Sequence, residues 1–149
     1  MTELSGRELG AWRGFLRVHA ALLRELDAEL DAEHGLPLTS YDVLIYLRTA
    51  PGRRLRMAEL ADSILLSRSG VTRLVDRLVR EGLIERESCE SDGRGSFAVL
   101  TDDGAAVLDR ARPSHLAAVR ERFLRHFSDD ELRTLAEYWE RVRPGAAQT

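Results

Sequence analysis

Short polar and basic side chains gather on one face of a segment near the middle of the chain. Four of them fall within two turns if residues 68–81 form a helix: Arg68, Ser69, Thr72 and Arg73. Arginine can make two hydrogen bonds to guanine, and serine or threonine can contact a base edge or a phosphate. This spacing therefore predicts base contacts in the major groove of DNA.

Arg77 lies one turn further along the same face. Its position predicts a phosphate contact or an ion pair with Asp76 or Glu81. An arginine-bearing face on an isolated helix is more often simply solvated. The neighbouring segments therefore decide between a solvated face and a DNA-binding face.

A turn rich in glycine follows this helix. Residues 83–87 and 96–100 have strand character, and Ser91, Asp92, Gly93, Arg94 and Gly95 lie between them. An arginine at the tip of a hairpin can enter a minor groove, where the negative potential attracts it, and Asp92 can hold the turn or the guanidinium. We therefore predict DNA contacts by Asp92 and Arg94.

These segments form the parts of a winged helix-turn-helix. A short helix is predicted over residues 56–63, a connector follows, and Ser67 is a suitable N-cap for the helix over 68–81, which Gly82 ends. The two strands form a hairpin that must lean on neighbouring helices, since a lone hairpin is marginally stable. The predicted fold class is mainly α with a small β-wing.

The flanking segments predict longer helices with defined ends. Ser5 with Glu8, and Ser128 with Glu131, have capping-box spacing, so helices should begin near Gly6 and Asp129. The first should end at Gly35. Two further N-caps are predicted at Thr39 and Thr101, and Pro113 predicts a kink or a break within residues 102–127.

The first of these helices carries an apolar stripe with a sustained period of 3.5 residues. Its members are Leu9, Trp12, Leu16, His19, Leu23, Leu26 and Leu30. A helix near 30 residues is longer than a small domain needs for its own core. The stripe therefore predicts packing against another helix, which a second subunit can supply.

Composition favours a globular protein with a locally basic segment. Hydrophobic residues make up 44% of the 149 residues. The sequence contains no run of about 18 apolar residues that would span a membrane, and its N-terminus does not have the pattern of a signal peptide. We therefore expect a cytoplasmic protein with no membrane partner. The net charge is −3, yet residues 48–80 hold eight arginines against three acids. The positive charge is concentrated where DNA contacts are predicted.

The sequence contains no motif typical of an enzyme or a metal site. It has no P-loop, nucleophile elbow or dinucleotide fingerprint, and its four histidines lack the spacing of zinc ligands. We therefore expect neither catalysis nor a cofactor. The single cysteine, Cys89, excludes an intramolecular disulfide.

The sequence resembles the MarR family of bacterial transcription regulators. The resemblance is carried by Leu60-Ala61, by residues 67–78, by residues 81–86 before the wing, by Asp92 and Arg94, and by Leu100-Thr101 with Gly104. Two positions depart from the family pattern. Arg56 stands where a capping Thr or Ser is usual, and Leu65 stands where Gly is common.

The resemblance implies a homodimer that binds a pseudo-palindromic operator in double-stranded DNA, and a ligand-responsive repressor function. It also implies three regions: residues 1–35 as an N-terminal dimerisation helix, 36–100 as the winged helix-turn-helix domain, and 101–149 as C-terminal dimerisation helices. A small aromatic or phenolic effector would bind between the interface helices and the DNA module.

Aromatic residues on the first two predicted helices are candidates for that effector pocket. They are Trp12, Phe15, His19, Tyr41 and Tyr46, although core packing explains their helical spacing equally well. Two alternatives to a ligand-responsive repressor remain open. One is a protein-interaction module with a basic face, and the other is a redox-responsive regulator acting through Cys89, whose acidic neighbours Glu87 and Glu90 disfavour a thiolate.

Overall fold

Helices make up most of the chain, and its strands form one small sheet. The computed structural model describes residues 3–64, 68–88 and 95–148. The elements follow in the order α1 (Gly6–His34), α2 (Leu38–Thr49), η1 (Pro51–Arg53), β1 (Arg54–Arg56), α3 (Met57–Ser63), α4 (Arg68–Arg80), β2 (Ile84–Ser88), β3 (Ser96–Leu100), α5 (Asp102–Arg122), η2 (Leu124–His126) and α6 (Asp129–Val142). The predicted mainly α fold with a small β-wing is confirmed.

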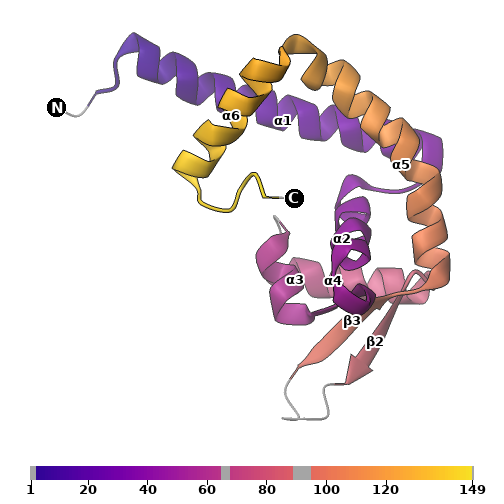
Figure 1. Ribbon diagram of the computed structural model, residues 1–149. Coiled ribbons are helices and arrows are strands. Elements are labelled where there is room, and N and C mark those ends of the chain that lie inside the picture. Colours follow the sequence, from indigo (N-terminus) through magenta and orange to yellow (C-terminus); the bar gives the residue numbers. More distant parts are fainter. Residues whose placement is uncertain (1–2, 65–67, 89–94, 149) are drawn as a thin grey trace.

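The long helices and the sheet lie in different parts of the molecule (Figure 1). One part contains α1, α6 and the far end of α5, and the other contains α2, α3, α4 and the sheet. α5 joins the two parts, since it contacts both α1 and α2. No helix in the described ranges is long and apolar enough to cross a membrane.

Capping boxes start the first and last helices where the sequence predicts them. The Ser5 backbone N–H donates to the Glu8 carboxylate at 2.7 Å, and the Glu8 N–H donates to Ser5 Oγ at 3.3 Å. Ser128 and Glu131 repeat this arrangement. α1 ends at Gly35, whose φ of 61° is the left-handed conformation that glycine adopts easily.

The predicted N-cap at Thr39 is wrong. The N-cap is Pro37, two residues earlier, so that α2 begins at Leu38, and no side chain of its own segment caps it. Instead, the Leu38 N–H donates to Asp27 Oδ1 of α1 at 2.8 Å. A carboxylate from the neighbouring helix therefore satisfies a donor that the local sequence leaves open.

The wing is a three-stranded sheet rather than the predicted two-stranded hairpin. Its strand order is β1-β3-β2, all antiparallel, and Leu55 in β1 lies opposite Ala98 in β3. β1 is only three residues long, so it carries too little alternation to be predicted from the sequence. The extra strand gives the hairpin the support that it needs.

Pro113 does not interrupt α5. The helix runs from Asp102 to Arg122, bends along its length (Figure 1), and ends at Phe123, whose φ and ψ of −127° and −63° are not helical. Thr101 caps it as predicted, since its Oγ1 accepts the Gly104 N–H at 3.0 Å.

One hydrophobic core joins the helix-turn-helix to the sheet and to the start of α5. Its most deeply buried large side chains include Leu44, Leu47, Leu60, Leu78, Ile84 and Leu108. By contrast, large apolar side chains on α1 and α6 are exposed, among them Trp12, Phe15 and Trp139. The core therefore stabilises the part of the molecule that contains the sheet. The apolar side chains of α1 and α6 at the other end are not buried by the described residues.

Candidate nucleic-acid interface

α4 buries one face and exposes the other, as its periodicity predicts. Val71, Val75 and Leu78 are fully buried, whereas Ser69, Thr72 and Arg73 are exposed. The buried face fixes the rotation of the helix about its axis, and this rotation directs the polar face to solvent. Arg68 begins α4, but its side chain lies outside the described part of the structure.

Arg73 is available for a partner outside the chain. It is exposed, and no ion pair or hydrogen bond engages its side chain within the described residues. A guanidinium has five N–H donors in a planar fork, which suits two parallel hydrogen bonds to guanine or to a phosphate.

Arg77 is instead engaged within the chain. Its Nη2 donates to Ser40 Oγ of α2 at 2.9 Å, and its Nε lies 3.9 Å from Glu81 Oε1. Asp76 is likewise engaged, because its Oδ1 lies 2.8 Å from Arg86 Nη2 on β2. These contacts fix α4 against α2 and the wing, and within the described residues they leave the exposed Arg73 and Arg80 of α4 without an ion pair or hydrogen bond.

The wing is fastened to the C-terminal end of α4. Gly82 ends the helix with a φ of 76°, and the Thr101 hydroxyl donates to the Gly82 carbonyl at 2.7 Å. The strands therefore leave α4 in a fixed direction. The tip residues Asp92 and Arg94, and also Cys89, lie outside the described residues.

Arginines of β1 form a basic edge that the sequence analysis does not assign to the site. Arg54 lies with its guanidinium carbon 4.2 Å from the centre of the Phe97 ring of β3, and that of Arg56 lies at 5.4 Å. Leu55 between them faces the core, but the three-residue Arg-Leu-Arg run is too short to predict a strand, so the sequence carries no signal that would have revealed them.

Comparison with known proteins agrees with this geometry. The sequence model described as the MarR family matches residues 34–95. The HTH-type transcriptional regulator MhqR of Bacillus subtilis (strain 168) is 31% identical over 116 residues, which cover 78% of each protein. The chain belongs to the MarR family.

Solved structures of other MarR-family members superpose closely on this one. Sco3205 of Streptomyces coelicolor, a MarR family transcriptional regulator in complex with DNA, is 36% identical with a TM-score of 0.90, over 100% of this chain and 93% of that one. AbsC of the same organism, also a MarR family transcriptional regulator, is 32% identical with a TM-score of 0.87, over 95% of each chain. The protein is therefore a MarR-family transcriptional regulator with a winged helix-turn-helix fold.

The five aromatic residues predicted for an effector pocket do not line one cavity in this MarR-family protein. Trp12, Phe15 and His19 form a row along α1, with ring centres 6.1 and 6.0 Å apart, and Phe15 also lies 5.7 Å from Trp139 of α6. Phe15 and His19 line an apolar groove of about 350 Å³ between α1 and α6.

The two tyrosines lie elsewhere. Tyr41 is buried, and its ring centre lies 4.4 Å from that of His115 on α5. Burial lowers the pKa of His115, whose Nδ1 has no hydrogen-bond partner in the described part of the chain. Tyr46 is 41% exposed on α2.

A different cleft lies between α1 and the DNA module, which comprises α2, α3, α4 and the sheet. None of the residues that line this cleft is among the predicted effector contacts. Its volume is about 420 Å³, and its lining is Leu23, Arg24, Asp27, Pro37, Leu38, Thr39, Asp42 and Ile64. Burial raises the pKa of the Asp42 carboxyl to about 6. Nowhere in the described ranges do three His, Cys, Asp or Glu side chains gather as a metal site would require.

Proposed function

We propose that this MarR-family regulator is a homodimeric, ligand-responsive repressor that binds a pseudo-palindromic operator. The first half of α4 enters the major groove, where Arg68, Ser69, Thr72 and Arg73 read base edges. Asp92 and Arg94 act at the minor groove through the wing, and Arg77 acts mainly by holding α4 in place. The observation that carries the proposal is the exposed Arg73, which makes no ion pair or hydrogen bond within the described residues, on a helix whose opposite face buries Val71, Val75 and Leu78.

Dimerisation follows from the geometry that an operator demands. Two recognition helices must address successive major grooves about 34–36 Å apart. The exposed apolar side chains of α1 and α6 supply a surface on which a second copy can pack. A small aromatic effector would weaken DNA binding by changing the spacing between the two modules.

The test begins with duplexes selected from a random pool and measures their binding by fluorescence anisotropy as the salt concentration rises. A dimer that neutralises several phosphates loses affinity steeply, with a slope of about 0.9 per phosphate in a plot of log K against log salt. Small aromatic acids are then screened for release of the duplex. A protein that binds no duplex at low salt acts instead as a protein-interaction module.

Arg73→Ala tests the base-reading role. We expect it to reduce affinity for the selected duplex by about 1–3 kcal/mol and to relax the sequence preference, because a bidentate contact to a base is lost. Arg110→Ala, on the exposed face of α5, serves as the control. An equal loss on selected and random duplexes would assign Arg73 to a phosphate rather than to a base.

A further inference from the structure

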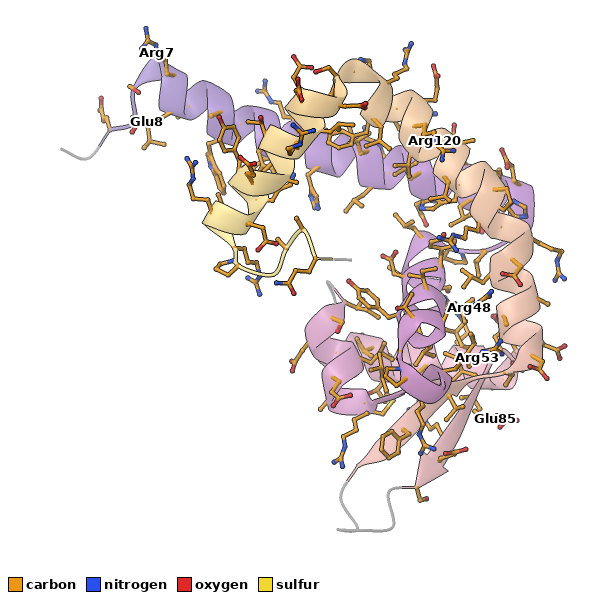
Figure 2. All side chains as sticks on the ribbon, viewed as in Figure 1. Arg7, Glu8, Arg48, Arg53, Glu85 and Arg120 are labelled. Atoms are coloured by element: carbon orange, nitrogen blue, oxygen red, sulfur yellow. The ribbon has the colours of Figure 1, made fainter. Side chains whose placement is uncertain are left out.

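The outer face of the sheet carries an arginine, Arg56, that no acidic group of the described residues neutralises. Arg53 lies 3.4 Å from Asp102, and Arg54 lies 2.9 Å from Glu87 across the sheet. Arg53 is labelled near the junction of α2 and the sheet in Figure 2. Arg56 is exposed, and its guanidinium makes no ion pair within the described ranges. It is therefore the β1 arginine whose charge remains available.

The side chain of Arg56 packs against Phe97 although its charge has no ion-pair partner within the described residues. It lies directly opposite Phe97 in the pairing of β1 with β3, so both side chains emerge on the same outer face. The ring centre lies 5.4 Å from the guanidinium carbon, within the range of a cation–π contact. The backbone N–H of Arg56 donates to the Glu59 carboxylate at 3.3 Å, which occupies that acid at the start of α3.

The position of Arg56 lies between the two elements that are expected to bind DNA. The next two residues, Met57 and Ala58, line a groove of about 180 Å³ together with Thr72 on the exposed face of α4. On its other side, Arg56 is paired to β3, the strand that returns from the wing. Figure 1 shows the lower end of the sheet beside the start of α3. Arg56 therefore directly precedes the residues that line this groove and is paired with the strand that returns from the wing.

We propose that Arg56 binds a backbone phosphate of the operator between the major-groove contact of α4 and the minor-groove contact of the wing. Phe97 is the positioning residue, because its ring holds the guanidinium on the outer face of the sheet. This proposal rests on the proposed DNA-binding function. A phosphate contact fixes the register of the protein on the duplex and reads no base.

The chemistry of the side chain fits a phosphate better than a helix cap. An arginine side chain has no acceptor, so it cannot cap the backbone N–H groups of α3 as a serine or threonine would. Its planar fork matches the oxygens of a phosphate and stacks on an aromatic face, which a lysine does less well.

Arg56→Gln tests the proposal in the full-length protein, with binding to selected and random duplexes measured over a range of salt. Loss of one phosphate contact per subunit should lower the salt slope of a dimer by about 2 and weaken both duplexes in the same proportion, roughly ten-fold or more near 0.1 M salt. Arg56→Lys keeps the charge and should retain most of the slope. Arg120→Gln, labelled at the opposite end of the molecule in Figure 2, should change neither quantity.

Phe97→Leu tests the positioning role through a double-mutant cycle. The single substitution should weaken binding, but it should cause no further loss when Arg56 is already Gln, since the guanidinium that remains on the ring is that of Arg54, which is paired with Glu87. Independent, additive losses would overturn the role of Phe97. Thermal unfolding of each variant checks that the sheet is intact.

The outcomes separate this proposal from the function on which it rests. A wild-type protein that binds no duplex would refute DNA binding itself, and Arg56 with it. Wild-type binding with an unchanged salt slope in Arg56→Gln would overturn the phosphate contact alone. A loss confined to the selected duplex would also overturn it, because Arg56 would then read a base.

Discussion

The partly buried carboxyl of Asp42 should contribute to the pH dependence of this protein's stability. Asp42 lies on α2 at the cleft between α1 and the DNA module, and it has no hydrogen bond or ion pair in the described part of the chain. Burial raises its pKa from 3.8 to about 6. The folded state therefore binds this proton more tightly than the unfolded state does, and the stability contributed by neutral Asp42 is lost as pH rises from about 4 through 6.

Asp42→Asn should stabilise the protein at pH 8 and have almost no effect at pH 4. The amide has a similar shape and no charge to bury, so the cost of ionisation disappears. We expect a gain of about 1–2 kcal/mol, less than the full pKa shift would give, because solvent screens a partly exposed group. Thermal unfolding at the two pH values measures it, and Asp62→Asn, on the exposed face of α3, is the control. An equal gain at both pH values would contradict the ionisation argument.

The side-chain types in the candidate site could be predicted from the sequence, but their hydrogen bonds and ion pairs with distant segments could not. The periodicity of Val71, Val75 and Leu78 fixes which face of α4 is outward. It cannot show that Arg77 is hydrogen-bonded to α2, because that partner is Ser40, which lies 37 residues earlier in the chain, whereas the longer contact with Glu81 lies one turn away. Contacts between distant segments decide which outward arginine is free.

The junction between the wing and α5 depends on the absence of one side chain. Gly104 lies in the first turn of α5, and a Cβ there would overlap the carbonyl oxygen of Leu83 and lie 2.7 Å from Leu100 Cδ1. The backbone oxygen cannot move without disturbing the Thr101 N–H that donates to it at 3.2 Å. This close approach fixes the direction in which α5 leaves the sheet.

Gly104→Ala should destabilise the protein by about 1–3 kcal/mol, because the added methyl group overpacks the junction. Gly6→Ala is the matched control, since Gly6 also lies in the first turn of a capped helix but has open space around it. It should be neutral or slightly stabilising, since alanine favours a helix. Denaturant unfolding compares the two variants, and equal midpoints would show that the junction tolerates a side chain.

Elements with local signals could be predicted, and elements fixed by distant partners could not. The capping boxes of α1 and α6 lie within four residues and are confirmed. The start of α2 depends on Asp27 of another helix, and β1 exists because β3 returns more than 40 residues later to pair with it. Neither interaction leaves a periodic pattern in the segment that it orders.

At the scale of the whole molecule, ion pairs connect α5 both to α1 and to α2. Arg122 lies 2.8 Å from Glu25 and 2.5 Å from Glu29, which ties α5 to α1. Arg48 of α2 lies 2.7 Å from Asp109, which ties the same helix to the DNA module. Through these ion pairs α5 connects α1 to α2.

The uncovered aromatic row on α1 gives the last prediction. Phe15 is 45% exposed and lies among Trp12, His19 and Trp139, so a charge at this position would enter any interface formed there. Phe15→Glu should convert a dimer to a monomer at micromolar concentration, because an unpaired carboxylate is costly to bury. Light scattering after size exclusion measures the mass, and DNA affinity should fall with it.

Tyr46→Glu is the matched control, because Tyr46 is an aromatic residue of similar exposure on α2. It should leave the mass unchanged. If Phe15→Glu also remained dimeric, the second copy would have to pack on another surface, and the 3.5-residue stripe of α1 would lose its assigned role. A wild-type protein that is monomeric at micromolar concentration would contradict the dimer itself, since a single recognition helix cannot address both halves of a palindromic site.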